Sequence, residues 1–254
     1  MTPERPAVAL RPRLLVPLRV EARGIAKAMR ARGHHPPFGL APGSGAPTPI
    51  VVGPRDGPAR WIEREAASGD LLILAGTAGG LRTPSAAGAA FAVTRVFDED
   101  GRLRATCSHP LPPMLTVSPG SLVCVDAPAA TLDAKRSLAS KNPAATLVDM
   151  ESLPFVEAAE RKGLPWVIVR GVSDGPDDEL PVEAMQWITA TGAMSWSALL
   201  ASIARRPSLM TALPALARHS RRALRSIADL VNAVLNGVEA TTAGGDRNGT
   251  LDRA

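Results

Sequence analysis

The pattern of hydrophobic and polar positions is clearest in the second half of the chain. Residues 166–172 form an apolar run broken only by Arg170, which is typical of a strand buried on both faces of a sheet. Before it, the spacing of apolar positions predicts a helix over residues 152–162, with Asp149 as its cap and Gly163 at its end. This region therefore predicts a strand and helix of an α/β domain.

The same two periodicities recur along the rest of the chain. Further strands are predicted over residues 13–18, 49–52, 71–75, 89–96 and 122–125. Further helices are predicted over residues 21–32, 59–67, 132–140 and 182–191. Strands that alternate with helices in this way predict an α/β fold, a three-layer α/β/α sandwich. We expect a domain over residues 1–203, a basic helical extension over 204–240 and a disordered tail over 241–254, with a Pro/Gly-rich connection over 34–49.

Length and composition favour a single cytoplasmic domain. A chain of 254 residues can form one large α/β core. Cys107 and Cys124 are too few for a disulfide framework and lie in no metal-ligand cluster, so we expect reduced thiols and no metal. The beginning of the chain lacks an uninterrupted signal-peptide core, and no apolar run approaches the ~20 residues of a membrane span.

Positive charge is concentrated near the C-terminus. The net charge is +5, and no acidic residue lies between Glu183 and Asp229. Residues 205–225 contain no aromatic side chain for base stacking, which argues against nucleic acid. Apolar residues at three- and four-residue spacing lie opposite the arginines. This pattern fits a helix on an anionic membrane surface and equally a helix packed on its own domain, although Pro207 and Pro214 break the region into pieces.

Candidate chemistry lies where two of the predicted elements meet. Asp174 follows the strand over 166–172, and Glu151 precedes the helix over 152–162. Acidic residues at the carboxyl ends of such strands line the crevice where α/β sheets bind ligands. We therefore expect Glu151 and Asp174 to face one pocket.

Three segments resemble a known enzyme family. They are Met150-Glu151 with RGVSD over 170–174, DLLILAGTAGGL over 70–81, and LVPLRVEARG over 15–24. Over residues 14–200 the chain is similar to the purine nucleoside phosphorylase superfamily, and most to its methylthioadenosine/S-adenosylhomocysteine nucleosidase branch. The resemblance implies a mixed central sheet, cleavage of a nucleoside N-glycosidic bond, no cofactor, and a homo-oligomer.

The resemblance also implies roles for individual residues. Asp174 would protonate the leaving purine, with its pKa held up by burial or by Glu151, and Ser173 and Arg170 would orient the carboxylates. Glu21 would position the attacking water. These four form the expected catalytic set.

A second set is expected to bind the substrate. Glu151 would accept hydrogen bonds from the ribose 2'- and 3'-hydroxyls above Met150. The turn of Gly76, Thr77 and Ala78 would hold a phosphate or the water that replaces it. Asp126 begins the segment that contacts the base, where Pro128 and Ala129 stand in place of the family's stacking Phe pair. The resemblance leaves open whether inorganic phosphate is a co-substrate. Its candidate ligands would be Arg19, Arg23 and Arg82.

The C-terminal segment resembles one particular branch of this superfamily. Residues 192–227 look like the tail of hopanoid-associated phosphorylases, and residues 123–135 and 149–152 also suit that branch. This implies adenosylhopane, a lipid-linked adenosyl substrate, and peripheral contact with the anionic inner membrane surface. The alternatives are a soluble methylthioadenosine/S-adenosylhomocysteine nucleosidase and a catalytically silent nucleoside-binding protein.

Overall fold

The computed structural model describes residues 10–31, 47–107, 109, 119–189 and 191–245. Most of the Pro/Gly-rich connection and the last nine residues of the expected tail lie outside these ranges. Within them, no helix is long and apolar enough to cross a lipid bilayer.

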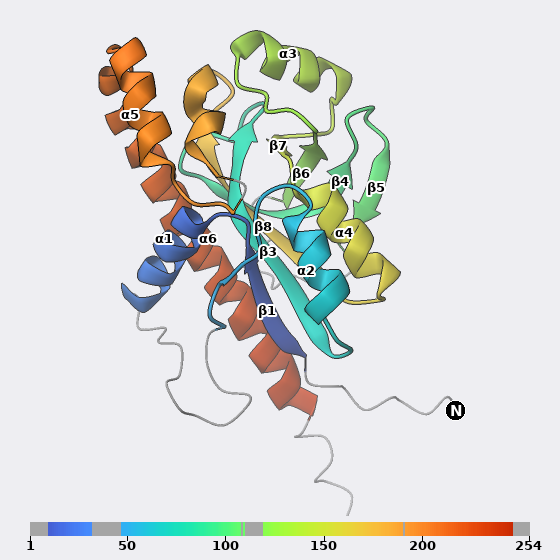
Figure 1. The fold of residues 1–254 in the computed structure, drawn as a ribbon. Coiled ribbons are helices and arrows are strands. Elements are labelled where there is room, and N and C mark those ends of the chain that lie inside the picture. The colour runs from blue at the N-terminus through green and yellow to red at the C-terminus, as the bar shows by residue number, and fades with distance from the viewer. Residues whose placement is uncertain (1–9, 32–46, 108, 110–118, 190, 246–254) are drawn as a thin grey trace, which may run out of the picture.

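The centre of the molecule is one mixed sheet of eight strands (Figure 1). The strands are β1 (Arg11–Val16), β2 (Ile50–Val51), β3 (Asp70–Gly80), β4 (Ala90–Phe97), β5 (Leu103–Thr106), β6 (Pro119–Cys124), β7 (Leu147–Asp149) and β8 (Trp166–Asp174). Their order is β2-β1-β3-β7-β6-β4-β5, and β8 pairs with both β3 and β4. β8 is parallel to β3 and antiparallel to β4, so the expected mixed sheet is confirmed.

Helices cover both faces of this sheet, as the predicted three-layer sandwich requires. On one face, α2 (Gly57–Glu65) and α4 (Ser152–Arg161) pack over a core that contains Ile62 and Phe155. On the other face, α1 (Arg19–Ala31) and α6 (Leu209–Gly245) pack against each other and against the sheet. α3 (Leu132–Lys141) adds a smaller core beside β6 and β7.

The long helix α6 corrects the expected domain boundary at residue 203. Its apolar residues Ile227, Val231, Val234 and Leu235 are buried in the same core as β1, β3 and β8. Pro214 lies within the helix, so it does not break the region there. The part of the apolar stripe from Leu224 to Leu235 is therefore packed into the domain core.

Other differences concern short elements. The helix expected over 182–191 is a 3₁₀ turn, η2 (Val182–Trp187), followed by an isolated bridge between Ile188 and Met194. The strands β5 and β7 have only four and three residues, too few to show a periodicity. α5 (Trp196–Arg205) follows the bridge, with the side chain of Ser195 as its cap.

Candidate active site

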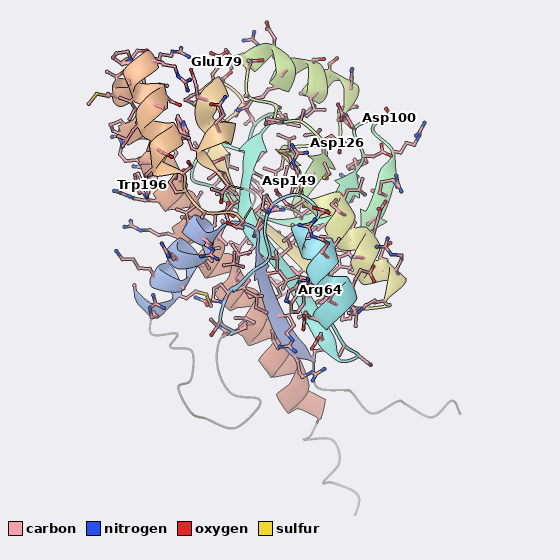
Figure 2. The ribbon with its side chains drawn as sticks, viewed as in Figure 1. Arg64, Asp100, Asp126, Asp149, Glu179 and Trp196 are labelled. Carbon is pink, nitrogen blue, oxygen red and sulfur yellow. The ribbon has the colours of Figure 1, made fainter. Side chains whose placement is uncertain are left out.

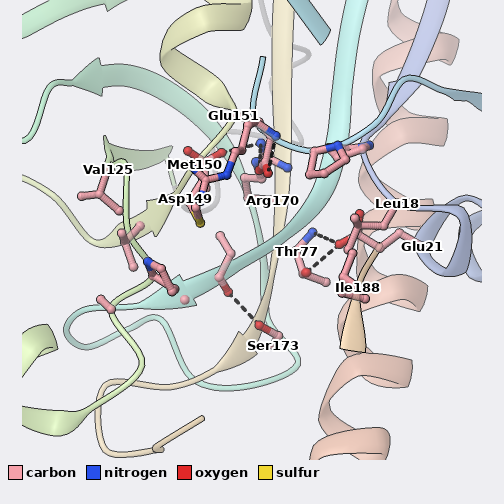
Figure 3. A pocket seen from close by; sticks show the side chains of 18 of the residues that line it. Leu18, Glu21, Thr77, Val125, Asp149, Met150, Glu151, Arg170, Ser173 and Ile188 are labelled. Atoms are coloured by element: carbon pink, nitrogen blue, oxygen red, sulfur yellow. Dashed lines mark hydrogen bonds and ion pairs between the residues drawn. The ribbon is translucent and has the colours of Figure 1, made fainter. Parts of the chain in front are cut away.

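A cavity of about 640 Å³ lies at the carboxyl ends of β1, β3, β7 and β8 (Figure 3). Its walls include three carboxylates from three different segments: Glu21 at the start of α1, Glu151 after β7, and Asp174 at the end of β8. The structure therefore brings together acidic residues that are up to 153 positions apart in sequence. The expectation that Glu151 and Asp174 share one pocket is confirmed.

A bulge at the end of β8 decides which side chains reach the cavity. Ala78 pairs with Val172, but the next residue, Gly79, pairs with Asp174, so Ser173 is an extra residue on β8. Successive side chains of a regular strand point to opposite faces, and a bulge re-aims them. Ser173 and Asp174 consequently both line the cavity although they are neighbours in sequence.

Both carboxylate oxygens of Asp174 have partners. The Ser173 hydroxyl donates to Oδ1 at 2.5 Å, and the buried ammonium of Lys135 donates to Oδ2 at 2.6 Å. Burial raises the pKa of Asp174, while Lys135 and Ser173 act to lower it and Asp178 raises it further. Asp178 is therefore a neighbouring carboxylate that contributes to the rise, and the sequence had not indicated it.

Arg170 is the cation at the centre of the site. It lies fully buried in β8, where its Nη2 forms an ion pair with Asp149 and lies 3.5 Å from Oε2 of Glu151. The same nitrogen donates to the Ser152 hydroxyl at 3.4 Å. A buried guanidinium is tolerable only with such opposite charges around it. Arg170 therefore lies against Glu151, as expected, whereas among the described residues no hydrogen bond or ion pair joins it to Asp174.

The two carboxylate oxygens of Glu21 differ in their hydrogen bonds. Oε1 accepts hydrogen bonds from the backbone N–H of Thr77 at 2.8 Å and from its hydroxyl at 2.6 Å. Oε2 is buried without a hydrogen-bond partner in the described part of the chain. Burial raises the pKa of Glu21, against the lowering effects of Thr77 and Arg170. A carboxylate of raised pKa with an open lone pair is suited to accept a proton.

The glycine turn of β3 creates the space beside these groups. A methyl group on Gly76 would lie 2.6 Å from Nη1 of Arg170 and 3.2 Å from Oε2 of Glu21. Only a residue without a side chain fits between them. Thr77 and Ala78 line the cavity itself, whereas Gly76 lies behind it and lets the two charged groups approach.

Glu151 lines the cavity next to Met150. Burial raises the pKa of Glu151 to about 7 against the lowering effect of Arg170, and Asp149 and Glu21 add to the rise. The backbone N–H of Arg55 donates to Oε1 of Glu151 at 3.3 Å. Arg55 is the one described residue other than glycine with positive φ, at 57°, a conformation that concentrates at functional sites.

The remaining wall is apolar, and one expected residue is missing from it. Val125, Pro128, Ala129 and Leu180 line the cavity. Asp126 does not: it is exposed and borders a separate polar cleft with Asp98 and Lys141 (Figure 2). Residues 125 and 126 follow the end of β6, and the chain places Val125 rather than Asp126 against the cavity.

The arginines proposed as phosphate ligands also lie elsewhere. Arg19 and Arg23 are exposed on α1 and do not line the cavity. Arg82 donates to the carbonyl groups of Ala139, Asn142 and Pro143, so it fixes the end of α3. Among the described residues, no group of three or more His, Cys, Asp or Glu side chains could hold a metal ion.

Sequence reasoning missed Lys135 and the ion-pairing role of Asp149. A signal for Lys135 was available, because Lys135 lies three residues before the buried Leu138 on α3 and so shares its inward face. Asp149 was expected to cap α4. Its Oδ1 does accept from the backbone N–H of Ser152 at 3.2 Å, while Oδ2 is the partner of Arg170.

Comparison with known proteins agrees with this geometry. A family model described as "Phosphorylase superfamily" matches residues 100–205, which include Glu151, Arg170 and Asp174. No curated protein matches the chain.

Solved structures match over nearly the whole chain. The 5'-methylthioadenosine nucleosidase of Arabidopsis thaliana is 18% identical, with a TM-score of 0.57 over 94% of this chain and 98% of that one. The 5'-methylthioadenosine/S-adenosylhomocysteine nucleosidase of Helicobacter pylori is 12% identical, with a TM-score of 0.59 over 90% and 99%. The futalosine hydrolase of the same organism is 13% identical, with a TM-score of 0.57 over 90% and 98%.

These likenesses define the fold as that of the nucleoside phosphorylases and nucleosidases. Together with the family match over residues 100–205, they support an enzyme of the nucleoside phosphorylase or nucleosidase type.

Proposed function

We propose that the protein hydrolyses the N-glycosidic bond of an adenosine-type nucleoside and releases adenine. The observation that carries this proposal is the placement of Glu21, Glu151 and Asp174 around one cavity, with Oε2 of Glu21 left unpaired by the described residues. Breaking a ribosyl bond passes through an oxocarbenium-like state. Such a reaction needs a proton for the leaving base and an activated nucleophile on the other face of the sugar.

The residues divide these tasks between them. Asp174, whose pKa is raised by burial, donates a proton to the departing base against the wall of Val125 and Pro128. Glu21 takes a proton from water as that water attacks the anomeric carbon. Glu151 accepts hydrogen bonds from the sugar hydroxyls, and its position is fixed by Arg170.

The charges in the cavity favour water over phosphate as the nucleophile. Asp149 is paired with Arg170 and Asp174 with Lys135, which leaves the carboxylates of Glu21 and Glu151 without a full counter-charge. A phosphate anion placed beside Glu21 would meet an acidic group of like charge in a buried setting, which is unfavourable. The arginines at the rim, Arg55 and Arg60, are exposed, and Arg60 is paired with Asp56.

The finer proposal concerns the 5'-substituent, for which we infer a lipid such as the hopane of adenosylhopane. The apolar side chains of Leu18, Leu180 and Ile188 also line the cavity. The bridge between Ile188 and Met194 leads directly into α5, which carries Trp196 near its start (Figure 2). Trp196 and Leu200 are 68% and 64% exposed. Exposed Trp and Leu side chains on a helix that ends at the exposed Arg205 are suited to the surface of an anionic membrane.

An assay of adenine release tests both the proposed hydrolysis and the proposed lipid 5'-substituent. The wild-type protein is incubated with methylthioadenosine, S-adenosylhomocysteine and adenosylhopane in detergent micelles, with and without inorganic phosphate. We expect adenine in the absence of phosphate, and the highest kcat/KM for the lipid-linked substrate. Preference for methylthioadenosine would replace the lipid with a small 5'-substituent, and strict dependence on phosphate would refute hydrolysis. Absence of release from every substrate would support a silent binding protein.

A further inference from the structure

We propose that Lys135 is a positioning residue for the acid: it forms with Asp174 a single proton-holding pair that keeps a transferable proton in the site at neutral and alkaline pH. This inference rests on the proposed cleavage of a nucleoside, and it assigns a residue to that reaction which neither the motifs nor the comparisons indicate.

The geometry places the Lys135 ammonium directly on the proposed acid. Its side chain is 1% exposed, and its ammonium nitrogen donates to Oδ2 of Asp174 at 2.6 Å, to the carbonyl of Gly175 at 2.6 Å and to the carbonyl of Asp178 at 2.8 Å. An ammonium group has three donors, so all of them are used. Two neutral carbonyls hold the nitrogen in place, and the one charged partner is the proposed acid.

The other charged groups near the pair are engaged or face solvent. Oδ2 of Asp178 accepts from the backbone N–H of Gly175 at 2.8 Å, and it is the neighbouring carboxylate that acts on Asp174. On α3 itself, Asp133 and Arg136 are exposed and lie 3.9 Å apart. Glu179 accepts from the backbone of Leu132 at the start of this helix. The proton of the pair is therefore shared chiefly between Lys135 and Asp174.

The proton movement is balanced within the site. As the bond between the anomeric carbon and the base nitrogen breaks, its electron pair goes to the base, and the base takes a proton from the carboxyl group of Asp174. That proton comes from Lys135: an N–H bond of its ammonium breaks and the O–H bond on Asp174 forms before the base takes the proton, so the pair is left as a carboxylate and a neutral amine. Water attacking the sugar gives its proton to Glu21. After the base leaves, the pair regains a proton from solvent through the open cavity.

This arrangement has a consequence for pH dependence. Two coupled groups bind and release protons as a unit, so the neutral pair holds one proton that can pass through Asp174 to the base. A buried Asp174 without Lys135 would be a lone acid, and it would lose its proton above its own pKa. From that pH upward, the fraction that can act as acid falls about tenfold per pH unit.

The test compares kcat/KM of wild type, Lys135→Met and Lys141→Met from pH 5 to 9.5. Lys141 is exposed on the same helix, and its variant is the matched control. The ratio of variant to wild type at each pH removes the contributions of Glu21 and Glu151. Two substrates are used: methylthioadenosine, and 4-nitrophenyl β-D-ribofuranoside, whose leaving group departs without a proton. Lys135→Gln, which keeps hydrogen-bond donors, is the second variant if the methionine variant does not fold.

We expect the Lys135 ratio for methylthioadenosine to fall about tenfold per pH unit across the alkaline part of this range. The ratio for the nitrophenyl substrate and both ratios for Lys141→Met should stay flat. A pH-independent Lys135 ratio, or equal losses on both substrates, would overturn the inference and indicate a purely structural lysine. If wild type cleaves neither these substrates nor adenosylhopane in detergent micelles, the proposed function itself fails.

Discussion

The placement of α6 in the core gives a prediction that is independent of the active site. Ile227 packs directly on β8, where a methyl group added to Gly171 would lie 2.8 Å from its side chain. Replacing Ile227 by Ala removes a fully buried side chain from a contact that has no room to collapse. Substitutions of this kind cost about 2–5 kcal/mol in the free energy of unfolding.

Removal of the whole helix is a stronger form of the same perturbation. Ile227, Val231, Val234 and Leu235 are buried, and each contributes about 1.5–3 kcal/mol by leaving water. Their sum, about 6–12 kcal/mol, is comparable to the entire stability of a typical domain, about 5–15 kcal/mol. A chain that ends at Ser208 is therefore expected not to fold cooperatively.

Urea unfolding monitored by circular dichroism measures both effects. The matched control is Met210→Ala on the same helix, because Met210 is 64% exposed and its loss should change stability by no more than about 0.5 kcal/mol. Equal midpoints for Ile227→Ala and wild type, or a sharp transition in the shortened chain, would show that α6 is a dispensable appendage and refute this reasoning.

Three further predictions concern the cavity. Asp174→Asn should slow adenine release by ~10² or more in steady-state assays, because the proton donor is lost. It should also lower the urea midpoint of unfolding, because Lys135 loses its counter-charge. An unchanged rate of adenine release would show that Asp174 is not the acid. Because the pKa of Glu151 is raised in the folded state, the free energy of unfolding should decline as pH rises from 4.5 to about 7. Glu151→Gln should flatten that decline in urea titrations. An equally steep decline in the variant would contradict the raised pKa of Glu151. Gly76→Ala should lower kcat/KM on the order of 10²-fold, because the ion-paired Arg170 cannot move away from the new methyl group; an unaltered kcat/KM would show that the site tolerates it.

The sequence predicted the elements that carry a long, regular pattern. The apolar run of β8 and the helix α4 agree with the structure within one or two residues, because burial on both faces and amphipathic spacing leave few alternatives. Glu151 and Asp174 follow strands or begin helices, so the rule for strand ends places them together. Glu151 and Asp174 on one cavity were therefore predictable from the pattern, whereas Glu21 was expected there only from the family resemblance.

Other features depend on contacts that no local pattern specifies. The bulge that turns Ser173 into the cavity depends on the register between β3 and β8. The pairing of Lys135 with Asp174 joins segments 39 residues apart. An amphipathic stripe indicates that one face of α6 is covered, but it does not distinguish a sheet from a membrane surface. Asp126 was wrongly expected at the cavity because a difference of one position after β6 determines whether residue 125 or residue 126 faces it.

The most direct test of the proposed chemistry identifies the source of the new oxygen on the sugar. Methylthioadenosine is cleaved by the wild-type protein in water enriched in oxygen-18 and containing inorganic phosphate, and the sugar product is analysed by mass spectrometry. Activation of water by Glu21 predicts a free sugar with one labelled oxygen at the anomeric position, and Glu21→Gln should suppress its formation. A sugar 1-phosphate without the label would contradict the proposed hydrolysis.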